Sequence, residues 1–450
     1  HLCILSSMNQ ENLEHTHNNS NMRKVALTAL AGTSIEWYDF FLYGAAAALI
    51  FPTVFFGEET PSTALILSLL TFAAGFIARP IGGIIFGHFG DKIGRKKTLI
   101  SALILMGISS TLIGLLPTYA MIGVTAPILL TLLRFAQGLA IGGQWGGAML
   151  LVTESAPSNQ RGYYGAFAQA GAPIGVILAN LALIITSALV SEEFFNTWGW
   201  RIPFLASSVL IVISMYIQLN LEDTKAFKEL VLHRNEQQDD AESVIQRSPI
   251  IEAIRKYPKR IILAAGAFIS VQVTFYILIA FLLAYGVQSV NMARDDMLAA
   301  VLIASAIMVP VQFVFSSYSD RHGRRGIFML GAVLSGLWAF AIFPLVDTGS
   351  FWLIVLAITG GLVFLAMMYG PQAAFFTELF STEVRYSGAT LGYQFGAIIG
   401  GAFAPTIAVK LWTELDIFWV SVYIAFAALL SLLSVMALTE TYQTDLNKTE

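Results

Sequence analysis

Long apolar runs, separated by short polar stretches, follow one another along almost the whole chain. A helix that crosses the hydrocarbon core of a bilayer needs roughly 20 mainly apolar residues, and twelve runs reach about that length. They lie at 24–50, 63–89, 98–116, 122–150, 162–190, 202–221, 260–287, 297–317, 327–346, 351–377, 388–410 and 417–438. The runs are continuous rather than alternating, which excludes a transmembrane β-barrel. The pattern predicts an all-α integral membrane protein with twelve transmembrane helices.

A hydrophilic stretch at 222–259 divides these runs into two groups of six. The expected segments are a disordered, polar N-terminal tail at 1–23, a six-helix bundle at 24–221, a loop at 222–259, a second six-helix bundle at 260–438 and a short tail at 439–450. Because the first residue is not methionine, we expect the natural start at Met8 or Met22. No signal peptide is recognisable, so the first span should serve as its own insertion signal.

Composition narrows the class of protein. Hydrophobic residues make up 56% of the 450 residues and charged residues 12%, whereas a soluble domain has about 25% charged residues. The formal net charge of −4 provides no basic face for nucleic acid. The single cysteine, Cys3, excludes a disulfide scaffold. The sequence has no metal-ligand spacing and no catalytic triad, so we expect no metal, no cofactor and no enzymatic activity.

Lysine and arginine are distributed unequally between the loops. Twenty of the 25 lie in the tails, in the stretch 222–260, or in the loops near 90–97, 161, 321–325 and 385. The opposite set of loops contains Arg201, Arg294 and Lys410. Because cytoplasmic loops carry an excess of basic residues, we expect both termini and the central loop in the cytoplasm.

Two short patterns occur once in each half of the chain. The segment 90–96 (GDKIGRK) matches 319–325 (SDRHGRR) at an offset of 229 residues. Glu154 with Arg161 matches Glu378 with Arg385 at an offset of 224. Parallel six-span repeats with a binding site between them are a known plan of transporters. The repeat therefore favours a carrier over a membrane enzyme or a receptor.

The loop at 90–97 (GDKIGRKK) resembles the signature of the major facilitator superfamily. Four further features resemble its metabolite:proton symporter branch: 35–40 (IEWYDF), 76–83 (FIARPIGG), 198–204 (WGWRIPF), and Arg134 with Gln137-Gly138. One difference is that Gln144 stands where the family commonly has a glutamate. The resemblance implies two parallel six-helix repeats and import of a small organic acid with protons by alternating access. Its substrate would be shikimate-like, a dicarboxylate or citrate-like, and the carrier would work as a monomer in a bacterial inner membrane.

Two other functions stay open. Osmolyte carriers of the same branch take up proline or betaine with protons, and they also have a cation at the positions that match Arg79 and Arg134. A transport-inactive receptor on a carrier scaffold is the alternative of another class. Such a receptor usually has an added soluble domain, whereas the longest hydrophilic stretch between spans here is the central one, 222–259.

Ionisable side chains inside the spans are concentrated in the first half. Glu36, Asp39, Arg79 and Arg134 lie there, and the last six spans contain no Asp, Glu, Lys or Arg apart from Arg260 and Lys410 at their ends. A charge at the bilayer centre costs at least about 2.5–3.5 kcal/mol, so it usually faces a partner or a wet cavity. Glu36 and Asp39 share a helix face at i, i+3 and are candidate proton-coupling residues. Arg79 and Arg134 are candidates for holding an anionic substrate, since a guanidinium matches a carboxylate. Alternatively, one carboxylate neutralises Arg79 in a structural pair.

Neutral polar residues complete the candidate sites. For substrate binding they are Gln137, Gln144, Tyr276 and Tyr369, the two tyrosines because the seventh and tenth spans face the cavity in the family. The resemblance also implies a cytoplasmic gate that latches the two halves together. Its candidate residues are Asp91, Arg95, Glu154, Arg161, Asp320, Arg324, Glu378 and Arg385. Alternatively, these cations only set the topology by the positive-inside rule.

Overall fold

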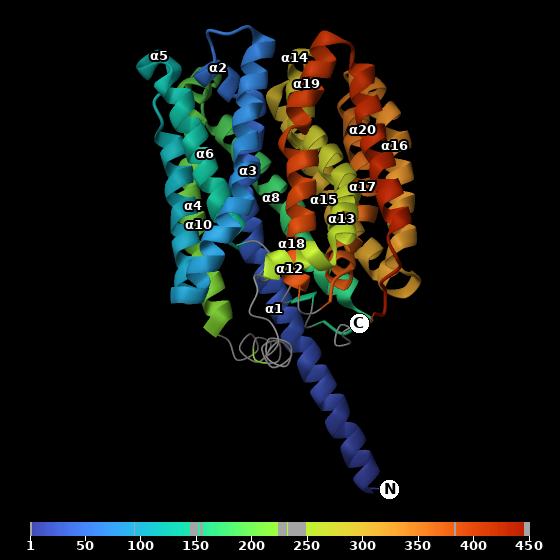
Figure 1. Cartoon of the computed structure of the whole chain (residues 1–450). Coiled ribbons are helices and arrows are strands. Elements are labelled where there is room, and N and C mark those ends of the chain that lie inside the picture. The colour runs from blue at the N-terminus through green and yellow to red at the C-terminus, as the bar shows by residue number, and fades with distance from the viewer. Residues whose placement is uncertain are drawn as a thin grey trace.

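The computed structural model describes the backbone of residues 2–93, 95–144, 152–153, 156–223, 232, 249–381 and 384–444. Side chains are described for the same residues except 2–21, 29, 87–93, 95, 96, 143, 144, 221–223, 249 and 386. The described part of the chain is helical and contains no β-strand (Figure 1). The all-α fold expected from the apolar runs is therefore confirmed.

The first half of the chain forms six long helices that stand side by side (Figure 1). They are α1 (Leu2–Leu49), α3 (Pro61–Ile93), α4 (Arg95–Leu115), α6 (Thr125–Gln144), α8 (Arg161–Leu189) and α10 (Arg201–Asp223). Short helices lie in the connections: α2 (Phe51–Phe55), α5 (Tyr119–Ile122), α9 (Glu192–Phe194) and the π-helix η1 (Phe195–Gly199).

The second half also crosses the molecule six times, but two of its crossings are interrupted by π-helical turns. These two are α13 (Pro258–Tyr276) with η2 (Ile277–Phe281) and α14 (Leu282–Gln288), and α18 (Arg385–Gly396) with η3 (Ala397–Ala402) and α19 (Ala404–Glu414). The other four are α15 (Arg294–His322), α16 (Arg324–Asp347), α17 (Phe351–Glu378) and α20 (Ile417–Ala437). The short α12 (Pro249–Lys256) precedes them.

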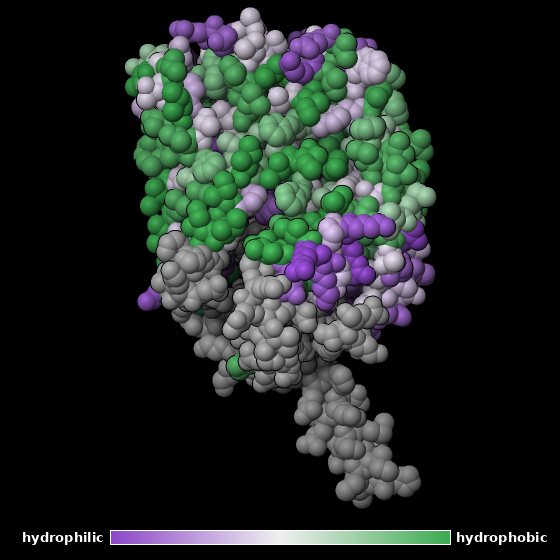
Figure 2. Space-filling model, in the orientation of Figure 1, coloured by the Kyte–Doolittle hydropathy of each residue, from purple (hydrophilic) through white to green (hydrophobic). Residues whose placement is uncertain are grey.

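Eleven helices among the described residues are long and apolar enough to cross a membrane. The twelfth expected span, 24–50, lies in α1, where the carboxylates Glu36 and Asp39 make the helix less apolar. Hydrophobic residues cover the sides of the molecule, and hydrophilic residues gather towards its two ends (Figure 2). This distribution fits a bundle whose sides face lipid.

The start of the chain differs from the prediction. Helix α1 begins at Leu2, so the backbone of residues 2–23 is helical rather than the expected disordered tail. The chain has no glycine or proline before Gly32, and these are the residues that most strongly disfavour a helix interior. The polar composition of this segment therefore did not predict where the helix begins.

Glycine brings α3 and α6 into direct backbone contact. A Cβ atom on Gly138 would lie 2.2 Å from the backbone oxygen of Gly75, and one on Gly142 would lie 1.9 Å from that of Arg79. Small residues permit such close packing between membrane helices. This contact fixes the part of α3 that carries Arg79.

We predict that Gly138→Ala destabilises the bundle, because the added methyl group must push α3 and α6 apart. Overpacking of this kind costs about 1–3 kcal/mol. The measurement is the thermal unfolding temperature of the purified protein in detergent. Gly326→Ala is the matched control, since a Cβ at Gly326 has no atom within 4 Å among the described residues. Equal unfolding temperatures for the two variants would contradict this account of the contact.

Candidate functional site

A cavity of about 20 Å³ lies where the two halves of the chain meet. A volume of this size holds about one water molecule, so the cavity has to widen before a small organic molecule can enter it. Both halves contribute to the wall, and most of the lining is aromatic. The lining residues are Trp37, Phe41, Ala172, Val271, Gln272, Phe275, Tyr276, Leu365, Tyr369 and Tyr393.

The two π-helical turns position one side of this wall. Tyr276 is the last residue of α13 before η2, and Gly401 lies in η3. A Cβ on Gly401 would lie 2.7 Å from Gln272 Oε1 and 2.9 Å from Phe76 Cε1, so glycine lets η3 approach both α13 and α3. The ring of Tyr276 then packs edge-on against Phe76 of the first half, with 4.9 Å between the ring centroids.

Arg79 lies directly behind this wall, inside an aromatic cage. Its Cζ atom is 4.2 Å from the ring centroid of Phe40, 4.6 Å from that of Phe76 and 5.1 Å from that of Trp37. Its side chain is buried, and within the described part of the chain none of its three guanidinium nitrogens has a hydrogen-bond partner. The alternative that Glu36 or Asp39 neutralises Arg79 in a structural pair is therefore wrong for this structure.

The second buried arginine shares one ring of that cage. The Cζ atom of Arg134 is 4.0 Å from the Phe40 centroid, so Phe40 contacts both guanidinium groups. Arg134 Nη1 donates a hydrogen bond to Gln137 Oε1 at 3.1 Å, and Gln137 Nε2 donates to Ser110 Oγ at 2.8 Å. Arg134 is thus oriented by a short polar chain inside the first bundle.

The two carboxylates of α1 face α10 and do not line the cavity. Asp39 is buried, with Ser110, Ser207 and Arg134 around it, but neither of its oxygens makes a hydrogen bond of normal geometry within the described residues. Glu36 accepts a hydrogen bond from Gln218 Nε2 of α10. The predicted common face of the two carboxylates is observed, and it points into the first bundle.

At one end of the molecule, which we call the α12 end, a buried arginine joins several helices. Arg324 forms ion pairs with Asp320 at 2.7 Å and with Glu378 at 2.8 Å. The carboxylate of Asp320 also accepts hydrogen bonds from the backbone N–H groups of Gly162 (2.7 Å) and Tyr163 (2.9 Å). These groups open α8 of the other half, and a helix N-terminus favours a negative charge. Asp320 therefore ties the two halves together.

The end of the chain reinforces this cluster. Burial acts to raise the pKa of Glu440, but four backbone N–H donors, from Arg324, Arg325, Thr441 and Tyr442, outweigh it and lower that pKa. The Thr441 hydroxyl donates to Glu378 Oε2 at 2.9 Å. Arg161 lies 3.6 Å from Glu378 Oε1 and donates to the Thr444 carbonyl oxygen at 2.7 Å.

The structure thus brings together four of the predicted gate residues, Arg161, Asp320, Arg324 and Glu378. Arg385 follows Glu378 closely in the sequence, and it donates a hydrogen bond to the backbone oxygen of Phe380 at 3.3 Å. The other predictions fall outside the described side chains, namely Asp91, Arg95, Glu154 and Gln144.

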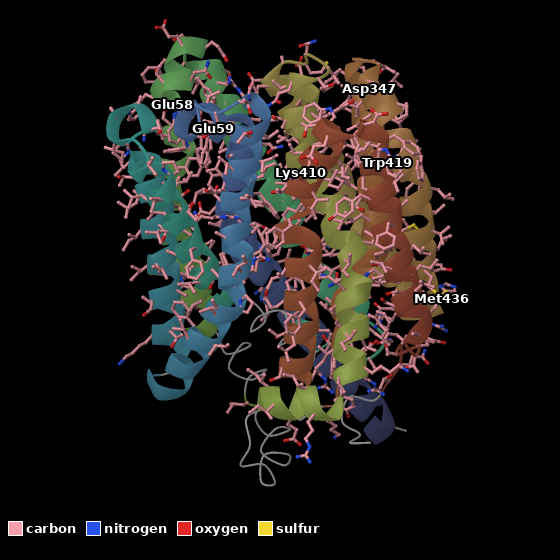
Figure 3. All side chains as sticks on the ribbon, turned by 45° about the horizontal axis from the view of Figure 1, so that its top comes forward. Glu58, Glu59, Asp347, Lys410, Trp419 and Met436 are labelled. Carbon is pink, nitrogen blue, oxygen red and sulfur yellow. The ribbon has the colours of Figure 1, made fainter. Side chains whose placement is uncertain are left out.

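The opposite end, which we call the α9 end, holds a link that sequence reasoning missed. Arg294, the first residue of α15, binds both carboxylate oxygens of Glu192, each at 3.1 Å. Its Cζ atom lies 4.0 Å above the Phe195 ring, and Nη2 donates to Ser187 Oγ at 3.1 Å. The sequence did contain a signal for this link, because Arg294 lies in the set of loops that contains few basic residues. Glu58, Glu59 and Asp347 lie at the same end (Figure 3).

Charged links therefore hold the two halves together at both ends, with the small cavity enclosed between them. An all-helical membrane protein with a cavity between two bundles, and with ionic contacts between those bundles at both ends, has the build of a carrier. The chain belongs to the Major Facilitator Superfamily, whose sequence pattern matches residues 37–391. Membership makes it a multi-pass membrane transporter rather than an enzyme.

Similar proteins span nearly the whole chain. An inner membrane metabolite transport protein of Escherichia coli (strain K12) is 38% identical over 436 residues, which is 95% of this chain and 96% of that protein. The shikimate transporter of the same organism is 36% identical, covering 95% and 97%. A proline/betaine transporter of Salmonella typhimurium is 34% identical, covering 93% and 84%.

The solved structure of the proton:xylose symporter XylE has the same fold. It superposes with a TM-score of 0.72 at 17% identity, covering 96% of this chain and 98% of that one. The resemblance to this superfamily that the sequence indicated is therefore confirmed, and so is the twelve-helix fold.

We predict that breaking the link at the α9 end opens the cavity towards that end. The reporter is Ala172→Cys, which lines the cavity, in a Cys3→Ser background that removes the single native cysteine. Loss of the Glu192 charge removes about 1 kcal/mol, so Glu192→Gln should raise labelling by a membrane-impermeant thiol reagent by roughly fivefold.

The exchange Glu192→Arg with Arg294→Glu should restore slow labelling, because it re-forms the pair in reverse. Lys410→Gln is the control, since it breaks an exposed pair with Glu414 inside a single helix. The prediction fails if Glu192→Gln labels at the same rate as the control.

Proposed function

We propose that the chain imports a small organic acid together with protons by alternating access. The single observation that carries this proposal is the buried Arg79. Among the described residues it has no carboxylate partner and no hydrogen bond of normal geometry, although the Tyr276 hydroxyl lies near it. A buried charge without a partner is costly, so an arginine at this place is best explained by an anion that binds during transport. A carboxylate is the planar, bidentate partner that a guanidinium prefers.

The cavity wall suggests how the rest of such a substrate would be held. Tyr276 lies between Arg79 and the cavity, and Tyr369 and Gln272 belong to the second half. The Gln272 oxygen has no hydrogen-bond partner among the described residues. Hydroxyl groups on a small acid would supply donors to it. Charge recognition then comes from the first half, and shape and neutral polar contacts come from the second.

Proton coupling is assigned to Asp39, with Glu36 as the second candidate. Asp39 is buried beside Arg134, and Arg134 and Arg79 contact the same Phe40 ring. An anion at Arg79 offsets positive charge near Asp39, so anion binding and proton binding favour each other. Glu36 accepts a hydrogen bond from Gln218 of α10. Gln144 stands where the family commonly has a glutamate, and as a glutamine it has no carboxylate to carry a proton.

The arrangement in the membrane follows from the charge distribution. We place both termini and the segment 222–259 in the cytoplasm of a bacterium, with bundles at 24–221 and 260–438. The α12 end is then the cytoplasmic gate, and the α9 end faces outwards. Each chain contains a complete cavity between its own halves, which supports transport by a monomer.

Uptake of a zwitterionic osmolyte such as betaine is the second candidate. It is favoured by the aromatic lining, which includes Trp37, Phe275 and Tyr276. Aromatic faces bind quaternary ammonium groups by cation–π contacts, while Arg79 would hold the carboxylate. The proline/betaine transporter among the relatives adds weight to this candidate, as the shikimate transporter does to the first.

Uptake into proteoliposomes tests the proposal. We predict that, with acid outside, the protein accumulates one labelled acid among shikimate, oxoglutarate and citrate, and that collapse of the pH gradient abolishes accumulation. Accumulation of glycine betaine alone would move the assignment to osmolytes. Binding of a compound without counterflow of its label would favour a receptor. Protein-free liposomes are the control.

Coupling is tested by removing each carboxylate in turn. Asp39→Asn should abolish gradient-driven accumulation and spare exchange of labelled for unlabelled substrate, because the neutral side chain cannot take up or release the proton. Glu36→Gln should retain more accumulation than Asp39→Asn does, since the Glu36 carboxylate is hydrogen-bonded to Gln218. If Asp39→Asn accumulates substrate like the unmodified protein and Glu36→Gln does not, the assignment is reversed.

A further inference from the structure

The short helix α12 lies across the end of α13 rather than in line with it (Figures 1 and 3). The bend is at Tyr257, whose backbone has φ −129° and ψ 45°, directly before Pro258. A residue before proline is disfavoured in the α-helical region, so the sequence itself breaks the helix here. Because α13 crosses the membrane from Pro258, α12 is held at the level where the bilayer begins.

Three faces of α12 have different surroundings. Ala253 is fully buried against the protein. Ile251 and Ile254 lie three residues apart and are 64% and 48% exposed, so they form an uncovered apolar face. Glu252 and Lys256 lie four apart on the third face, which is polar. A helix with an apolar face and a basic polar face lies in the plane of a membrane interface.

Basic residues border the apolar face. Arg255, Lys256 and Lys259 are exposed, and Figure 2 shows hydrophilic residues directly beside the hydrophobic ones in this part of the surface. The segment 255–260 carries four positive charges and no acidic residue. Each lysine or arginine near an anionic leaflet contributes about 1 kcal/mol to binding.

The helix is fixed to the part of the protein that carries the α12-end cluster. Arg260 Nη1 donates to the backbone oxygen of Leu379 at 2.8 Å, one residue after Glu378. The Tyr257 ring packs edge-on against Phe380, with 6.0 Å between the centroids. These contacts keep the apolar and basic faces in a constant orientation relative to the bundle.

We propose that α12 and the basic segment 255–260 form a binding surface for anionic phospholipid. The isoleucines enter the boundary between headgroups and acyl chains, and the basic side chains bind the lipid phosphates. This surface is separate from the cavity and does not depend on which substrate is carried.

The test uses Ile251→Cys in the Cys3→Ser background, labelled with bimane and reconstituted in phosphatidylcholine vesicles. Brominated phosphatidylcholine should quench the label, as it should at Leu337→Cys on the side of α16, where Leu337 is 67% exposed. A label at Glu252→Cys on the polar face should be quenched much less. Absence of quenching at Ile251→Cys would overturn the proposal.

Charge recognition is measured by comparing brominated phosphatidylglycerol with brominated phosphatidylcholine at equal mole fraction. We expect stronger quenching by the anionic lipid, and each of Arg255→Gln and Lys259→Gln should lower that preference by up to roughly fivefold. Lys410→Gln, at the α9 end, should leave it unchanged. Equal quenching by the two lipids in the parent protein would overturn the anionic selectivity. Elution of each variant as a single peak on size exclusion shows that the bundle is intact.

Discussion

A guanidinium group without an anionic partner, enclosed in a low-dielectric interior, is the constraint on which the other features of this carrier depend. Arg79 is held there by backbone contact between α3 and α6, which glycine at 138 and 142 permits. The rings of Trp37, Phe40 and Phe76 give it cation–π contacts, worth up to about 2 kcal/mol each when desolvated. These contacts lessen the cost of burial but leave the N–H donors of Arg79 without a hydrogen bond of normal geometry, which is why we propose that an anion binds there.

The enclosure of that site depends on contacts at both ends of the bundle. At the α12 end, Asp320 and Glu378 surround Arg324, and Asp320 also caps α8 of the other half. At the α9 end, Arg294 binds Glu192 with two hydrogen bonds. The link at the α12 end is buried and has several hydrogen bonds, whereas at the α9 end the side chain of Glu192 is 69% exposed. The two ends therefore differ in strength, and the link at the α9 end is the weaker of the two.

Much of this could be predicted from the sequence, because span length, loop charge and the repeated loop pattern are local properties. The membrane fold and the four charged residues inside the spans followed from them. The partners of those residues could not be predicted from these local properties. The Glu36 contact with Gln218 and the shared Phe40 ring depend on how helices rotate against one another, which residue spacing within one helix does not fix. The same holds for Arg294 with Glu192, which lie 102 residues apart.

The most direct test of the central claim is equilibrium binding of labelled shikimate and labelled glycine betaine to the purified protein and to Arg79→Gln. A charge-assisted hydrogen bond contributes about 1.5–3 kcal/mol. We therefore expect Arg79→Gln to weaken binding of the recognised compound by at least about tenfold, and Arg79→Lys to retain part of the affinity. Unchanged affinity in a folded Arg79→Gln protein would contradict the account.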